Sequence, residues 1–324
     1  MVKTRVTQML GIEYPIVGGA MMWISDAEFT ASISNAGGIG VLASAMFTTR
    51  KDFETALDRL KDLTDKPFAV NLNLFPSMRV IDNNEYLEVM ISKGVRIVET
   101  SGHAAPESLA VKFKEAGLIW MHKCVGVRYA KKVEALGADI ITVVGYENGG
   151  ATGKLDIGSL VLVPRVVESV NIPVIGGGGV CDGKSFAAML ALGAEGVIMG
   201  TRLLATREAP IHDKLKNALL NAEELDTMLV MRSVGSTHRV WSNSAANKCI
   251  QMEAQNCSLQ ELIGVVGGLQ AKKMYSDGDL DAGVISCGQC IGRCHDLPSM
   301  NELVQRIVTE GEAMVRKLSQ AFSS

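Results

Sequence analysis

The chain has 324 residues, of which 47% are hydrophobic and 21% are charged, and its formal net charge is −3. This balance is typical of a folded globular protein and excludes a disordered chain. A nucleic-acid partner is disfavoured because binding it needs a basic surface, and seven scattered cysteines favour reduced thiols over a disulfide-linked secreted scaffold.

The N-terminal residues lack the apolar stretch and the small-residue cleavage site of a signal peptide. No apolar run reaches the roughly 18–20 residues that a spanning helix needs. We therefore expect a cytoplasmic protein with no membrane partner.

Residues 1–210 alternate short β-branched runs with longer amphipathic stretches. Several runs, such as Pro173–Gly176, are apolar without alternation, which is typical of a strand buried on both faces. Eight strand-plus-helix units of roughly 25 residues each predict a (β/α)8 TIM barrel, and a doubly wound open sheet is the alternative. The predicted strands are Tyr14–Ala20, Gly38–Ala43, Phe68–Phe75, Val95–Gly102, Leu118–Val125, Ala138–Glu147, Ile172–Val180 and Gly196–Leu204.

The sequence changes character after Leu204. Residues 211–275 are predicted to form helices, for example Asp213–Leu220 and Ser258–Val265, and no strand. Met300–Phe322 is predicted to be another amphipathic helix. We expect a barrel over residues 1–210, a smaller, mostly helical substrate-capping domain over 211–276, and a return segment over 277–324 whose helix packs on the barrel.

A glycine cluster, Gly176–Gly179, follows the seventh predicted strand, and Gly200-Thr201 ends the eighth. In barrels these two loops form the recurring phosphate site. Glycine lets backbone N–H groups approach a phosphate closely. A tight turn is the alternative, although one glycine would satisfy it. The ligand would be FMN, PLP or a sugar phosphate, and Lys123 would form a Schiff base with PLP or place a cation near flavin N1/O2.

Several short motifs occur along the chain in a specific combination and order. They are Thr4–Thr7, Tyr14–Ile16, Ser34–Gly40, Val70–Leu74, His122–Cys124, Gly177–Gly179, Met199–Glu208 and Gly288-Gln289. In this combination the sequence resembles the nitronate monooxygenase (2-nitropropane dioxygenase) family, whose relatives include an NADH:quinone reductase and flavin-dependent enoyl-ACP reductases. The resemblance covers nearly the whole chain and implies an FMN-binding barrel with a helical second domain.

The resemblance implies FMN as the cofactor, with contacts along the isoalloxazine ring, at its polar edge and at the phosphate. On the residues alone, Asn71 is also explained as a strand-end turn residue and Lys123 as a surface lysine. The implied contacts are Gly19, Ala20 and Met21 along the ring, Asn71 and Lys123 at its edge, Gly177, Gly178, Gly179, Gly200 and Thr201 at the phosphate, and Gln289 closing the site.

The sequence departs from the resemblance in the loop after the sixth predicted strand. Members commonly carry a His there that takes the α-proton from a nitroalkane, and the matching residue is Ala151. An anionic nitronate is already deprotonated and needs no base, so its oxidation with O2 is the predicted activity. Neutral nitroalkanes should react poorly, because Ala151 cannot remove their α-proton. NAD(P)H-dependent reduction of a quinone or an enoyl substrate is the alternative. No catalytic residue is assigned, and the candidates are His103, Tyr146 and Glu147.

Two further interpretations stay open: a flavin-binding accessory protein, and a flavin-free barrel for a sugar phosphate. Arg232 or His238 in the second domain could contact an anionic substrate group. The run from Cys287 to His295 has a CxxCxxxC pattern that fits a zinc or iron–sulfur site, but only three cysteines cluster. We favour small core residues and predict no metal site. A homodimer is compatible with the sequence.

Overall fold

The computed structural model describes residues 2–75, 82–102 and 104–323, and its parallel strands close into an eight-stranded barrel. The last strand returns to the first, with Val17 opposite Ile198. The predicted (β/α)8 barrel is confirmed. In order around the barrel, the strands are β1 (Ile16–Gly18), β2 (Ile39–Ala43), β3 (Ala69–Asn73), β4 (Ile97–Ser101), β5 (Ile119–Cys124), β6 (Ile140–Val144), β8 (Val174–Gly177) and β9 (Gly196–Met199).

The barrel interior is filled by apolar side chains from the strands, including Val41, Met121 and Ile175. Helix α1 (Arg5–Leu10) contributes Val6 and Leu10 to the same cluster. Because α1 directly precedes β1, it plugs the end at which the strands begin. The opposite end, where the strands finish, is left for a site.

In the described part of the chain, seven helices cover the outer face of the barrel; they bury aromatic side chains such as Phe29 and Phe53 against it, and Trp120 of β5 is buried beneath them. Polar side chains fix several helix starts: Asp26, for example, accepts from the backbone N–H of Phe29. No helix in the described ranges is long and apolar enough to cross a membrane. The covering helices are α2 (Ala27–Asn35), α3 (Arg50–Leu63), α4 (Asn83–Ser92), α5 (Glu107–Glu115), α6 (Val127–Ala135), α7 (Ser159–Val167) and α8 (Gly183–Ala191).

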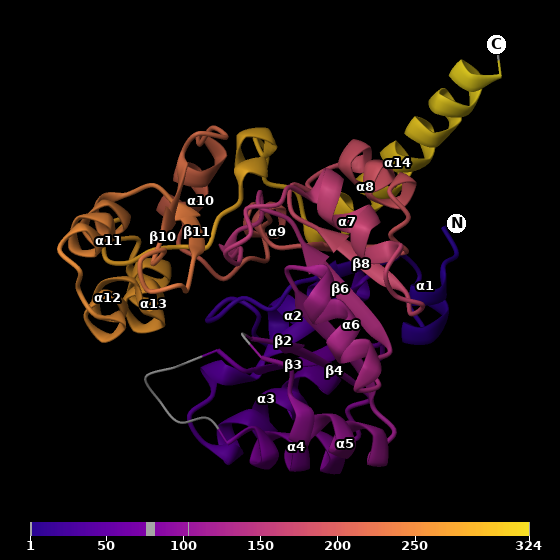
Figure 1. Cartoon of the computed structure of the whole chain (residues 1–324), viewed down its shortest axis with the longest axis horizontal. Coiled ribbons are helices and arrows are strands. Elements are labelled where there is room, and N and C mark those ends of the chain that lie inside the picture. The colour runs from indigo at the N-terminus through magenta and orange to yellow at the C-terminus, as the bar shows by residue number, and fades with distance from the viewer. Residues whose placement is uncertain (1, 76–81, 103, 324) are drawn as a thin grey trace.

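The second lobe lies beside the barrel and contains strands that the sequence analysis did not predict (Figure 1). Strands β10 (Thr227–Val230) and β11 (His238–Trp241) pair antiparallel, and β11 also pairs with β7 (Gly150–Ala151) from the loop after β6. The prediction of no strand in 211–275 is wrong, because four-residue strands carry little periodic signal. The other elements are α9 (Thr201–Leu204), α10 (Asp213–Leu220), α11 (Ser244–Ala254), α12 (Leu259–Val266) and α13 (Gly268–Asp277).

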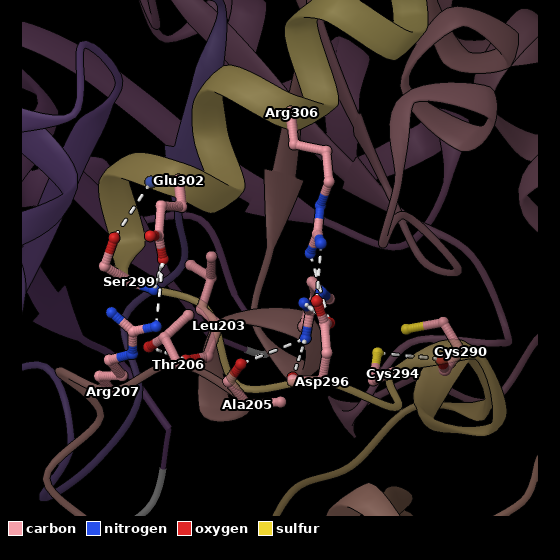
Figure 2. Close-up of polar contacts among 11 residues, drawn as sticks. Leu203, Ala205, Thr206, Arg207, Cys290, Cys294, Asp296, Ser299, Glu302 and Arg306 are labelled. Atoms are coloured by element: carbon pink, nitrogen blue, oxygen red, sulfur yellow. Dashed lines mark hydrogen bonds and ion pairs between the residues drawn. The ribbon is translucent and has the colours of Figure 1, made fainter.

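The chain then returns to the barrel and ends in α14 (Met300–Phe322), which packs against α8 where Gly183 meets Gly311. Figure 2 shows polar contacts of the returning segment and of α14, including the ion pairs of Glu302 with Arg207 and of Asp296 with Arg306. Asp296 accepts from buried Arg202 at 2.5 Å and from Arg306 at 2.6 Å. This ion-pair group fixes the return segment beside the predicted phosphate loops.

Candidate active site

A cavity of about 1290 Å³ opens at the end of the barrel where the strands finish, and the second lobe forms its other wall. Most of its lining is apolar, with Met21 and Ile198 from the barrel and Val230 and Ile263 from the second lobe. Pockets of this kind commonly occur at domain junctions. The predicted cofactor contacts that line this one cavity are Gly19, Ala20, Met21, Asn71, Lys123, Gly178, Gly179, Gly200 and Thr201.

The other two predicted contacts lie behind the cavity wall. The carbonyl oxygen of Gly177 accepts from Gly145 N–H and from the Ser159 hydroxyl, at 3.1 and 2.9 Å. The backbone N–H of Gln289 donates to the Glu147 carbonyl at 3.0 Å. Both residues therefore position neighbouring loops.

The loop after β8 has the backbone conformation that favours glycine. Gly178 and Gly179 have φ angles of +90° and +78°. A Cβ at Gly178 would lie 2.6 Å from Ser159 Oγ, so packing excludes a side chain there. A Cβ at Gly179 would meet nothing closer than 4.0 Å. Gly179 therefore leaves open space on the cavity side of the loop.

Backbone donors gather where β8 and β9 end. Among the described residues, no hydrogen-bond acceptor is found for the N–H groups of Gly179, Gly200 and Thr201, which all line the cavity. The Thr201 Oγ1 accepts from Gly288 N–H at 2.8 Å, which leaves the hydroxyl hydrogen to be donated. Such converging donors are the usual cradle of a phosphate group, so the residues present fit the phosphate of FMN.

A polar group occupies the floor of the cavity at the ends of β3, β4 and β5. The Asn71 amide nitrogen donates to buried Glu99 and, at 3.2 Å, to Ser101 Oγ. Burial raises the pKa of the Glu99 carboxyl, while the Lys123 charge and the Asn71 hydrogen bond oppose that shift. With its nitrogen held in this way, Asn71 keeps a carbonyl oxygen as acceptor, and Lys123 lines the same cavity. This pairing fits the edge of a flavin, which presents an N–H and carbonyl oxygens.

Sequence reasoning missed Glu99. The available signal was a charged residue inside an otherwise buried strand, since such residues are rarely buried without a partner.

The three catalytic candidates are placed differently. Glu147 lines the cavity, but its carboxylate accepts from the N–H and the hydroxyl of Ser159, both at 3.0 Å, and so caps α7. Tyr146 is not among the described residues that line the cavity, and its ring lies 4.6 Å from the Arg239 guanidinium carbon. His103 lies outside the described residues.

Two histidines of the described chain line the cavity, and they differ in their contacts. The ring of His122 lies 2.7 Å from Thr100 Oγ1 and packs edge-on against Trp120. Burial, helped by the Lys123 charge, lowers its pKa to about 4. His238 stands opposite Ala151 in the β7–β11 pair, so the two side chains share one face.

The cysteine run joins a partner that the sequence analysis did not include. The neighbouring thiols of Cys290 and Cys294 lower the pKa of the Cys181 thiol. The Cys294 thiol also donates to the Cys290 carbonyl at 3.2 Å (Figure 2). Within the described ranges, no group of three or more His, Cys, Asp or Glu side chains is arranged to hold a metal ion.

A family model, named relatives and a solved structure all match most of this chain. A model of the family described as nitronate monooxygenase matches residues 3–310. An enzyme of Rhodococcus jostii named as a hydroxy-methyl-oxo-octahydroindene-carboxyl-CoA dehydrogenase is 33% identical, over 95% of each chain. A probable nitronate monooxygenase of Staphylococcus aureus is 30% identical, over 78% of this chain and 81% of that protein. The solved structure of FabK from Thermotoga maritima superposes with a TM-score of 0.92 at 32% identity, covering 99% of this chain and 100% of the other.

Proposed function

The chain belongs to the nitronate monooxygenase family of flavin-dependent oxidoreductases, and from that premise we propose that it uses FMN to exchange two electrons with an acyl thioester. The observation that carries the proposal is the size of the cavity. At about 1290 Å³ it exceeds the roughly 300–1,000 Å³ of pockets for drug-sized ligands. It has room for FMN together with a second organic molecule much larger than a nitroalkane.

FMN would be held at its two ends. The free N–H groups of Gly179, Gly200 and Thr201 would bind the phosphate, and Asn71 with Lys123 would contact the polar edge of the ring. When bound, FMN supplies an acceptor and a donor of hydride. The Lys123 cation favours negative charge at the ring edge, and the apolar wall excludes water from it.

The acyl thioester would occupy the part of the cavity formed by the second lobe. Val230, Val234 and Ile263 give this part an apolar wall that suits a hydrocarbon chain. Likeness to an enzyme named for a carboxyl-CoA substrate, over nearly the whole of both chains, supports the same class.

Oxidation of alkyl nitronates is the second candidate. The likeness to a probable nitronate monooxygenase favours it. The substrate is an anion that needs no base, so Ala151 is no obstacle, and Lys123 offers a cation on the cavity wall.

An anaerobic screen distinguishes these functions. The purified protein should be yellow and release FMN. We expect butyryl-CoA to bleach the flavin, or NADH or NADPH to bleach it with crotonyl-CoA then restoring the colour. Bleaching by propyl-2-nitronate alone would instead establish the second candidate.

A cavity-filling variant locates the thioester. Gly264 in α12 lines the cavity, and a Cβ there would meet no atom within 4 Å. Gly264→Phe should raise the KM for the thioester at least tenfold and leave FMN affinity unchanged, with Gly264→Ala as the matched control. An unchanged KM in the Phe variant would contradict the proposed location.

A further inference from the structure

We propose that one edge of the cavity, formed by Arg128, Tyr129, Lys154 and Leu155, binds the phosphorylated adenosine of CoA. We call this edge the rim. The inference rests on the proposed function, because it needs a thioester substrate that carries a nucleotide. The rim would hold the end of the substrate that does not react, so that its binding energy positions the thioester at the flavin.

The rim belongs to the same cavity as the predicted flavin contacts. Lys123 at the floor, then Val125 and Tyr129, line the cavity in chain order as the end of β5 leads into α6. Lys154 and Leu155 line it from the segment after β7. The pantetheine arm of CoA is long and flexible, so it would follow this wall from the flavin to the rim.

Two large apolar side chains are exposed on the rim. Tyr129 is 36% exposed and Leu155 is 54% exposed. They meet over Gly126, because a Cβ built on that glycine would lie 3.5 Å from Tyr129 Cδ2 and 3.2 Å from Leu155 Cδ1. Every nucleobase has a π-face that stacks on an aromatic ring. The pair therefore offers an apolar surface of the kind on which an adenine ring stacks.

Two cations accompany this apolar pair. The guanidinium carbon of Arg128 lies 5.4 Å from the centroid of the Tyr129 ring. The Lys154 ammonium reaches the turn between β10 and β11, since a Cβ built on Gly235 would overlap it. A phosphate beside the stacked adenine would therefore have one cation from α6 and another from the segment after β7. Such charge-assisted contacts are the strong ones in phosphate recognition.

The protein does not neutralise these cations itself. In the described ranges, neither Arg128 nor Lys154 forms an ion pair with a carboxylate, whereas Glu107 and Asp156 are each paired with another cation at 2.6 Å. The whole chain has a net charge of −3, so unpaired cations at one cavity edge run against its overall charge. A local positive field of this kind favours an anionic ligand.

The first test compares butyryl-CoA with butyryl-pantetheine, which has the same thioester and lacks the nucleotide. Loss of one hydrogen bond to a charged group weakens binding roughly 10- to 100-fold. In the FMN-loaded enzyme, R128M/K154M should therefore raise the KM for butyryl-CoA at least about tenfold and leave that for butyryl-pantetheine unchanged. Lys114→Met, at an exposed lysine of α5 outside the cavity lining, is the matched control.

The second test does not depend on turnover. Calorimetric titration of the FMN-loaded enzyme with free CoA should show affinity about tenfold weaker in Tyr129→Ala, because base–aromatic stacking is lost. Tyr129→Phe keeps the ring and should bind CoA as the wild type does. Urea unfolding of both variants establishes that they are folded.

The outcomes separate the two proposals. Unchanged CoA affinity and unchanged KM for butyryl-CoA in R128M/K154M would overturn the inference alone. NADPH also carries a phosphorylated adenosine, so a loss of affinity confined to NADPH would overturn the assignment to CoA and give the rim to the dinucleotide. An enzyme that binds CoA through the rim but exchanges electrons with no thioester would overturn the proposed function and retain the subsite.

Discussion

Gly179 tests whether the loop after β8 binds the FMN phosphate. In Gly179→Ala the new methyl would enter open cavity space, with no atom closer than 4.0 Å. At φ +78° the alanine costs about 1–2 kcal/mol of folding free energy. Loss of one hydrogen bond to a charged phosphate costs a further 1.5–3 kcal/mol or so in binding. FMN affinity should therefore fall roughly 10- to 100-fold.

Two other glycines serve as controls for that variant. Gly117 has φ +64° and no atom within 4 Å of a built Cβ, so Gly117→Ala carries the same backbone strain away from the cavity. Gly178→Ala would instead clash with Ser159 and should destabilise the apo-protein. FMN fluorescence titration gives the affinity, and urea unfolding gives the stability. Equal FMN affinity in the Gly179 and Gly117 variants would refute the phosphate site.

The polar floor and the ion-pair group give three more predictions. Lys123→Met should lower the reduction potential of the bound flavin in a spectroelectrochemical titration, because the ring edge loses its cation; an unchanged potential would argue against that contact. Asp296→Asn should lower the free energy of unfolding, measured in urea, by about 3 kcal/mol, because Arg202 is only 2% exposed and would lose its carboxylate partner. Arg306→Met should lower it by at most about 1 kcal/mol. The hydrogen bond from Arg306, with the Arg202 charge, lowers the pKa of the Asp296 carboxyl in the folded protein. The stabilisation is therefore complete above the ordinary aspartate pKa of about 3.9 and is lost as the pH falls through the lower pKa of the folded state. Acid unfolding of D296N should lack this loss of stability.

The barrel could be predicted because each of its units is local in sequence. A strand, a turn and the following helix carry their own apolar pattern, as in Val174–Gly177 followed by the Asp182 cap of α8. The glycine-rich turn after β8 could be predicted for the same reason, since Gly178 and Gly179 are adjacent in the chain. The strands of the second lobe were not, because β11 depends on pairing with β7, which belongs to a distant loop.

The polar floor shows a second limit of the sequence. Asn71 and Glu99 are each visible as polar residues within predicted strands, but their contact depends on the register of β3 against β4. Register in a closed barrel follows from strand tilt and stagger. No local pattern in either strand specifies this register. Asn71 could therefore be singled out from the sequence, but its contact with the Glu99 carboxyl could not.

Cofactor binding and substrate choice would be carried by different parts of this chain. The proposed phosphate donors lie in the loops after β8 and β9, whereas Val230 and His238 line the cavity from β10 and β11. A change at Ala151 alters the cavity wall opposite His238 without altering the backbone donors of Gly179 or Thr201. Differences in substrate among relatives with the same glycine loops should therefore follow the hairpin and the residue opposite it, which is a pairing that only the folded structure reveals.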